Sequence, residues 1–258
     1  MTDTNASTPP RYPEGRNLLA GKTVLVTAAA GTGIGFATAK RCVEEGARVA
    51  ITDIHERRLD ESARELGALG IVANVTSETD VHRCFARVND ELGPVDVLVN
   101  NAGLGGTATL AEMTDEQWSA VLDVTLTGTM RMTRAALRHM YPRASGVIVN
   151  NASVVGWRAQ EGQAHYAAAK AGVMALTRCA ALEAAHYNVR INAVAPSLAM
   201  HAHLARVTTE ALLDELTTKE AFGRAAEPWE VANVIVFLAS DLSSYMTGEV
   251  VAVSSQHP

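Results

Sequence analysis

The chain has 258 residues, of which 48% are hydrophobic and 19% charged, and its formal net charge is −6. This composition excludes a largely disordered chain, and the acidic balance excludes a general attraction to nucleic acid or to anionic membranes. No apolar run approaches the length of a membrane span or resembles a secretory leader, so we expect one cytoplasmic α/β domain.

The N-terminal residues and the cysteines show no pattern of a catalytic or metal-binding site. Residues 1–18 are polar and rich in proline, and they predict a flexible tail before a domain over residues 19–258. Cys42, Cys84 and Cys179 lie too far apart for a zinc site or a redox pair. We therefore expect reduced thiols and no metal site.

Short apolar, β-branched runs recur along the chain and are typical of strands that are covered on both faces. They begin at Lys22, Ala47, Gly70, Val95, Gly146, Val189 and Glu249. Helical patterns fill the gaps, including a long one over residues 118–140. The alternation predicts a Rossmann-type, doubly wound parallel sheet of about seven strands in a single domain.

A glycine-rich segment, "TAAAGTGIG", follows the first predicted strand. Glycines at this place let the backbone approach a pyrophosphate, whose charge is favoured by the N-terminus of the next helix. The G-x-G-x-x-G pattern is incomplete because Phe36 stands at the third position, so the motif alone is a weak signal. The cofactor-binding candidates here are Gly31, Thr32, Gly33, Ile34 and Gly35.

Asp53 ends the second predicted strand. A carboxylate at this place accepts hydrogen bonds from the adenosine ribose and repels the additional phosphate of NADP, which favours NAD. Arg57 and Arg58 follow closely and could serve a 2′-phosphate, so NADP stays open as the alternative.

Ser153, Tyr166 and Lys170 form the most informative group in the chain. Tyr166 and Lys170 are four residues apart, so on a helix they share one face. A lysine ammonium near a phenol favours the phenolate, and we expect it to lower the tyrosine pKa from about 10. The Ser153 hydroxyl can hold the substrate oxygen. The group predicts proton transfer that accompanies hydride transfer by a nicotinamide cofactor.

The residues between Ser153 and Tyr166 are expected to line a substrate pocket. Trp157 offers a flat apolar wall for a bulky ring system, and Arg158 and Gln160 offer polar groups at the rim. The alternative is that Trp157 packs against a neighbouring subunit while Arg158 is solvated.

Residues 197–219 follow a strand end and predict a lid of two short helices over this pocket. The alternative is an ordinary surface excursion. His201 lies within this segment and is a further candidate for substrate contact.

With these motifs the chain resembles the short-chain dehydrogenase/reductase family from about residue 19 to residue 253. "NNAG", which ends at Gly103, is similar to a family motif beside the cofactor, and "RINAVAP" matches a later one. The resemblance implies that Lys170 also binds the nicotinamide ribose, and that backbone near Pro196 and Leu198 faces the carboxamide. It implies further cofactor contacts from Asn74, Val75, Asn101, Ala102, Gly103 and Tyr166, and a homotetramer packed through the helices after strands four and five.

Several positions depart from the family pattern. Ala28 stands where glycine is usual, and Gly31 could take over its positive φ angle. Thr125 occupies the place of a fourth catalytic residue, an asparagine whose backbone carbonyl holds a relay water. Asn74 replaces a common aspartate, and Ser197 and His201 are atypical beside the carboxamide.

Within the family, "NNASVVGWRAQ" and "SSQHP" resemble actinobacterial dehydrogenases of steroid degradation. Those enzymes oxidise a ring hydroxyl on a CoA thioester derived from cholesterol, and the resemblance implies a similar small-molecule substrate here. One alternative is an NADPH-dependent 3-oxoacyl-thioester reductase, against which Asp53 argues. The other is a dinucleotide-sensing protein without catalysis, against which the group of Ser153, Tyr166 and Lys170 argues.

Overall fold

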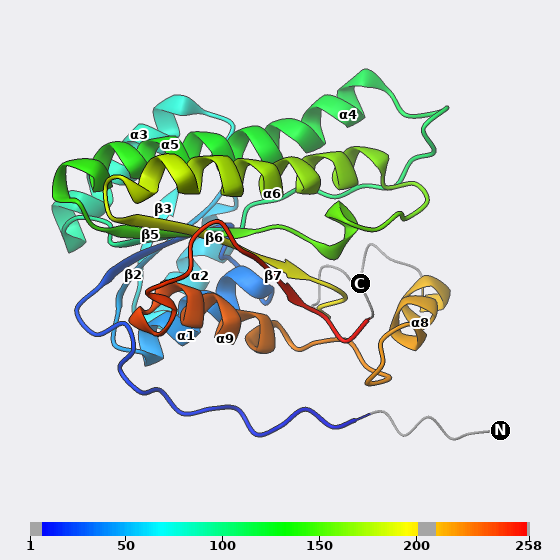
Figure 1. The fold of residues 1–258 in the computed structure, drawn as a ribbon, viewed down its shortest axis with the longest axis horizontal. Coiled ribbons are helices and arrows are strands. Elements are labelled where there is room, and N and C mark those ends of the chain that lie inside the picture. The colour runs from blue at the N-terminus through cyan, green and yellow to red at the C-terminus, as the bar shows by residue number, and fades with distance from the viewer. Residues whose placement is uncertain (1–6, 201–209, 257–258) are drawn as a thin grey trace.

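The protein is described by a computed structural model that covers residues 7–200 and 210–256. One sheet of seven parallel strands runs in the order β3-β2-β1-β4-β5-β6-β7 (Figure 1). The strands are β1 (Thr23–Thr27), β2 (Arg48–Asp53), β3 (Leu69–Val72), β4 (Val97–Asn100), β5 (Gly146–Asn151), β6 (Val189–Pro196) and β7 (Val250–Val253). All seven predicted strands are present, and the doubly wound fold is confirmed.

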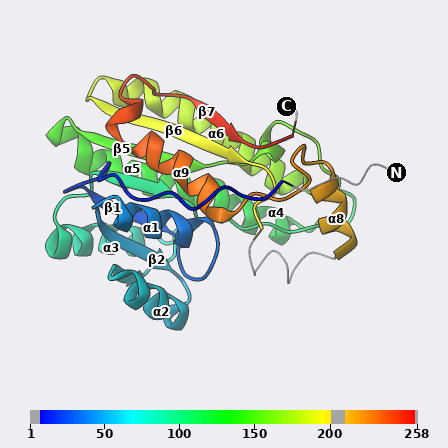
Figure 2. The same ribbon diagram turned by 90° about the horizontal axis from the view of Figure 1, so that it is seen from below.

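Helices cover both faces of the sheet (Figures 1 and 2). One face carries α1 (Ile34–Glu44), α2 (Glu56–Leu66) and α9 (Pro228–Ala239). The other carries α3 (Glu78–Leu92), α4 (Asp115–Leu122), α5 (Gly128–Met140) and α6 (Ala164–Ala185). Every residue of the central strands β1 and β4 is buried, as expected for strands between two helical layers.

The long helical pattern over residues 118–140 is interrupted in the structure. A π-helical turn at Asp123–Thr127 separates α4 from α5. Of the predicted lid, the structure describes one helix, α8 (Glu210–Thr218), while residues 201–209 lie outside the described part of the chain. No described helix is both long enough and apolar enough to span a membrane.

Residues 7–18, expected from the sequence to form a loose tail, run along α1 and α9 toward α8 (Figures 1 and 2). The Tyr12 hydroxyl donates a hydrogen bond of 2.6 Å to Glu44 of α1. The Tyr12 ring packs edge-on against Trp229 of α9, with 5.4 Å between the ring centroids. These contacts hold the segment against both helices, and the polar composition that suggested a tail gave no sign of them.

A buried ion pair lies where this segment meets α1. The Arg41 guanidinium and the Glu45 carboxylate are 2.6 Å apart, and both side chains are almost fully buried. Glu45 also accepts hydrogen bonds from the backbone N–H groups of Arg16 and Leu18, at 2.8 and 3.1 Å. The N-terminal segment is therefore bound to the same carboxylate that neutralises Arg41.

Replacing Arg41 tests the energetic weight of this pair. Arg41→Met leaves the Glu45 charge buried without its cation, so we expect the free energy of unfolding to fall by about 3 kcal/mol. The measurement is urea denaturation. The control is Arg87→Met, because Arg87 and Glu91 form an exposed pair on α3, where we expect a loss below about 0.5 kcal/mol. Equal losses in the two variants would contradict this account.

Candidate active site

The turn from β1 into α1 contains two residues with left-handed backbone. Gly31 has φ +104°, as the sequence suggested. Ala28 also has a positive φ, +50°, although its Cβ makes that conformation costly. The turn is thus left-handed at the position where the family has glycine and again at Gly31.

Gly35 allows α1 to approach the end of β4 closely. A Cβ atom on Gly35 would lie 2.4 Å from Asn101 Nδ2 and 2.5 Å from the Ala28 carbonyl oxygen. The Asn101 amide donates hydrogen bonds to the carbonyls of Thr27 and Ala28, at 3.1 and 3.0 Å. The Thr27 hydroxyl in turn accepts from the N–H groups of Asn101 and Ala102, both at 2.9 Å. These bonds fix the turn against β4.

The turn has the features that a dinucleotide needs. Among the described residues, no side chain caps α1 at Gly33, so the first-turn N–H groups are free to bind an anion. No described atom lies within 4 Å of where a Gly31 Cβ would stand, which leaves open space beside the turn. The Asp53 carboxylate accepts hydrogen bonds from Ala30 N–H at 3.3 Å and His55 N–H at 3.0 Å. Its position beside the turn suits a ribose.

The structure brings Ser153, Tyr166 and Lys170 together. Tyr166 and Lys170 lie on α6, and the Lys170 ammonium nitrogen is 5.5 Å from the Tyr166 ring centroid. Ser153 follows β5 and lies close enough to Tyr166 for a hydrogen bond between the two side chains to lower the pKa of the phenol. Lys170 donates a bond of 2.6 Å to the Asn151 carbonyl, and a Cβ on Gly103 would lie 3.5 Å from the ammonium. Gly103 is therefore a close neighbour of Lys170.

The protonation behaviour differs from the sequence expectation. Burial raises the pKa of Tyr166, and the hydrogen bond with Ser153 only partly offsets it. Burial also lowers the pKa of Lys170 to about 8, because the ammonium loses water. The expected lowering of the Tyr166 pKa is not found, because burial of the phenol disfavours its charged form.

Thr125 is fully buried in the π-helical turn. Its hydroxyl accepts a hydrogen bond from Leu104 N–H at 3.0 Å and donates to the Leu104 carbonyl at 3.2 Å. The Thr125 carbonyl, which by family resemblance would hold a relay water, accepts a hydrogen bond from the Thr129 hydroxyl at 2.7 Å. The second lone pair of that oxygen could still accept from a water. The Thr125 side chain thus fixes the loop that follows β4.

The candidate substrate residues lie around Ser153 with different exposure. Trp157 is 50% exposed, and Gln160 is half-buried. The Arg158 guanidinium donates to the side chain and to the backbone carbonyl of Gln256. His201 lies outside the described residues.

The remaining cofactor candidates occupy the ends of β3 and β6. Val75 is buried and packs in the core, whereas Asn74 lies in the exposed turn after β3. Pro196 ends β6, and the Leu198 N–H donates to Glu220 at 3.3 Å. Among the described residues, no three His, Cys, Asp or Glu side chains gather as a metal site.

Sequence reasoning missed Thr27, Asn151, Glu220 and Gln256. Thr27 and Asn151 close predicted strands, so their place at the carboxyl edge of the sheet was a usable signal. Glu220 and Gln256 carried no such signal, because their partners are far away in the chain.

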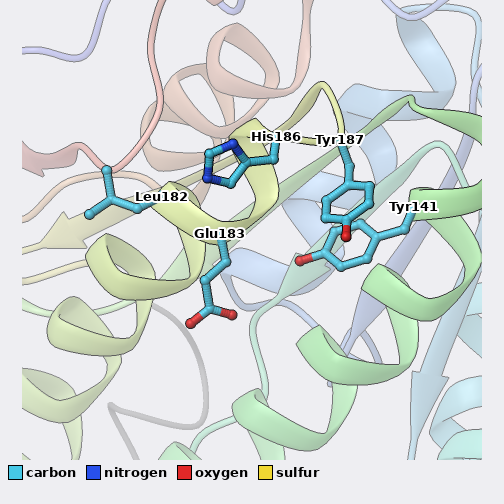
Figure 3. A pocket seen from close by; sticks show the side chains of 5 residues that line it. All are labelled: Tyr141, Leu182, Glu183, His186 and Tyr187. Carbon is cyan, nitrogen blue, oxygen red and sulfur yellow. The ribbon is translucent and has the colours of Figure 1, made fainter.

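A surface groove of about 430 Å³ lies away from this group (Figure 3). It is lined by Tyr141, Leu182, Glu183, His186 and Tyr187, with the two tyrosine rings stacked at 4.0 Å. Leu182 is separated from Tyr166 by roughly 24 Å along α6, at 1.5 Å per residue. The groove is therefore separate from the candidate active site.

Comparison with known proteins agrees with this geometry. Residues 28–255 match a family described as "Enoyl-(Acyl carrier protein) reductase". A solved structure of a short chain dehydrogenase from Mycobacterium smegmatis is 56% identical. It covers 98% of this chain and 100% of its own, with a TM-score of 0.88.

Curated relatives extend the comparison. The "(5R,7aS)-5-hydroxy-7a-methyl-1-oxo-2,3,5,6,7,7a-hexahydro-1H-indene-carboxyl-CoA reductase" of Mycobacterium tuberculosis is 60% identical, over 98% of this chain and 100% of the relative. A 3-oxoacyl-[acyl-carrier-protein] reductase of Thermotoga maritima is 40% identical, over 91% and 97%. These matches and the fold show that the chain belongs to the short-chain dehydrogenase/reductase family of oxidoreductases.

Proposed function

We propose that this protein interconverts a ring alcohol and its ketone on a steroid-derived CoA thioester, with NAD as the cofactor. The observation that carries the chemistry is the grouping of Ser153, Tyr166 and Lys170 beside Gly103, at the carboxyl edge of the sheet. The substrate class is supported by the 60% identical relative, whose name specifies a hydroxy-hexahydroindene CoA compound.

Each residue of the group has one task in the proposed reaction. The Ser153 hydroxyl donates a hydrogen bond to the substrate oxygen. Tyr166 accepts the proton of the substrate hydroxyl during oxidation and returns a proton to the substrate oxygen during ketone reduction. When bound, the nicotinamide supplies the hydride acceptor or donor. At pH values below the Lys170 pKa of about 8, the ammonium group of Lys170 places a positive charge near the phenol. Thr125 holds the neighbouring loop and its carbonyl can support a relay water.

The cofactor is proposed to lie along the carboxyl edge of the sheet. Its pyrophosphate would sit on residues 31–35, and its adenosine ribose on Asp53. Asn74 would adjoin the adenine, Asn101, Ala102 and Gly103 would lie beside the adenine and its ribose, and Val75 would be a further contact. Pro196 and Leu198 would adjoin the nicotinamide, with Lys170 on the second ribose.

The substrate pocket is proposed to lie beside Ser153. The exposed Trp157 ring would cover the rings of the substrate, with Arg158, Gln160 and His201 nearby. A second candidate function, 3-oxoacyl-thioester reduction with NADPH, is favoured by the relative from Thermotoga maritima. The Asp53 carboxylate beside the turn argues against it, because it would repel a 2′-phosphate.

Assembly and location are further parts of the proposal. A homotetramer would pack through the helices after β4 and β5, where Trp118 and Leu182 expose apolar surface. Sedimentation of the purified protein would check this. A cytoplasmic location suits the CoA thioester substrate.

Tyr166→Phe tests the reaction itself. We expect the natural protein to oxidise the ring-alcohol CoA thioester, and the variant to lose at least about a hundredfold in kcat, because it cannot transfer the proton. Oxidation by the natural protein should accelerate as pH rises, since the raised pKa of Tyr166 keeps it protonated at neutral pH. The measurement is NADH formation. Tyr245→Phe, at a fully exposed tyrosine, is the control. Undiminished turnover in Tyr166→Phe would refute the assigned role.

Asp53→Ala tests the choice of cofactor. We expect the natural protein to bind NAD more tightly than NADP. The variant should bind NAD about tenfold to a hundredfold more weakly, because hydrogen bonds to a charged group contribute about 1.5–3 kcal/mol. Calorimetric titration measures both affinities, and Asp60→Ala, at an exposed position on α2, is the control. Tighter binding of NADP to the natural protein would instead favour the reductase function.

A further inference from the structure

Glu220 is a buried carboxylate just after α8, with 4% of its surface exposed. Its Oε1 accepts hydrogen bonds from Leu198 N–H at 3.3 Å and from Gln256 Nε2 at 2.8 Å. Its Oε2 accepts from the Ser255 hydroxyl at 2.6 Å. A buried carboxylate is stable only when such donors replace water. Three segments therefore meet at Glu220: the chain after β6, the chain after α8 and the chain after β7.

The contacts of Glu220 extend to the loop that carries Ser153. The Gln256 side chain donates to Glu220 and accepts from the Arg158 guanidinium, which also donates to the Gln256 carbonyl at 3.2 Å. The Gln256 side-chain amide thus joins the Arg158 guanidinium to the buried Glu220 carboxylate. Arg158 lies five residues after Ser153, so the carboxylate is linked to both sides of the candidate active site.

Leu198 is fixed through both of its backbone polar groups. Its N–H donates to Glu220, and its carbonyl accepts from Ala226 N–H at 2.8 Å. In the described part of the chain, Glu220 is the hydrogen-bond partner of the Leu198 N–H. Removal of the carboxylate would leave that N–H without a partner, and the Leu198 backbone would then be held by the bond that its carbonyl accepts from Ala226 N–H.

The strand order places Leu198 near the reacting end of a bound dinucleotide. Asp53 ends β2 and Ser153 follows β5, so a cofactor that reaches from one to the other crosses the ends of β1 and β4. Its reacting end then adjoins β5 and its neighbour β6, which Leu198 follows by two residues. This step rests on the proposed function, because it assumes a dinucleotide that reacts beside Ser153.

We propose that Glu220 is a positioning residue that holds the Leu198 backbone against the nicotinamide end of the cofactor. Its hydrogen bond fixes the position of the Leu198 N–H. Glu220 therefore affects binding of the nicotinamide end of the cofactor and not binding of the adenosine end. The family resemblance assigns Glu220 no role, and its hydrogen-bond partners in the described part of the chain are Leu198, Ser255 and Gln256.

The test compares the binding of NAD with that of ADP-ribose, which lacks the nicotinamide. For Glu220→Ala we expect NAD to bind about fivefold to tenfold more weakly, the effect of one lost hydrogen bond, with ADP-ribose unchanged. Glu220→Gln should restore NAD binding, because its amide oxygen can accept from Leu198 and Gln256. Glu215→Ala, which removes an exposed ion pair between α8 and the following Lys219, should change neither affinity.

The outcomes decide the proposal without a turnover assay, so they are independent of the substrate. Selective loss of NAD binding with rescue by glutamine supports it. Equal weakening of both ligands, no weakening, or a glutamine variant as defective as the alanine variant overturns it. If Glu220→Ala does not fold, the affinities for NAD and ADP-ribose are measured on Ser255→Ala instead. This variant removes one of the donors that orient the Glu220 carboxylate, so selective loss of NAD binding is again the expected result. If the natural protein prefers NADP, the two ligands to compare are NADP and 2′-phospho-ADP-ribose.

Discussion

The hydrogen bonds of Asn101 are the constraint on which the rest of the site depends. Its amide nitrogen holds the carbonyls of Thr27 and Ala28 in the glycine-rich turn, and its amide oxygen accepts from Asn151 Nδ2 at 3.0 Å. The Asn151 carbonyl in turn accepts from Lys170. A continuous series of bonds therefore joins the proposed pyrophosphate turn to the proposed catalytic lysine across the ends of three strands. The distance between the two ends of the cofactor site is set by this series.

A second polar layer lies one residue deeper in the same strands. Asn100 donates to Thr133 at 3.0 Å and to Asn150 at 2.9 Å, and Asn150 donates to Thr177 at 2.9 Å. All four side chains are buried, so each bond replaces water that the groups have lost. The layer ties β4 and β5 to α5 and α6. Tyr166 and Lys170 consequently rest on a helix whose position is specified by directional bonds as well as by apolar packing.

The sequence was sufficient for the sheet and for the placement of Tyr166 and Lys170 on one helix, because both follow from local patterns. Continuous apolar runs mark buried parallel strands, and a spacing of four residues places Tyr166 and Lys170 on one helix face. Properties that depend on residues far apart in the chain could not be predicted from the sequence. The direction of the Tyr166 pKa shift depends on burial, and the roles of Glu45 and Glu220 depend on partners that only the folded chain brings near.

The segments at Ser7 and at Ser255 both bind beside Glu220. Ser7 N–H donates to the Phe222 carbonyl at 2.9 Å, and Ala221 N–H donates to the Ser255 carbonyl at 3.2 Å. The two residues that follow Glu220, Ala221 and Phe222, are therefore each held by a segment distant in the sequence. Loosening of the segment at Ser7 or of the segment at Ser255 would remove one of these supports. Contacts far from Ser153 and Tyr166 in the sequence are therefore coupled to the edge of the proposed active site.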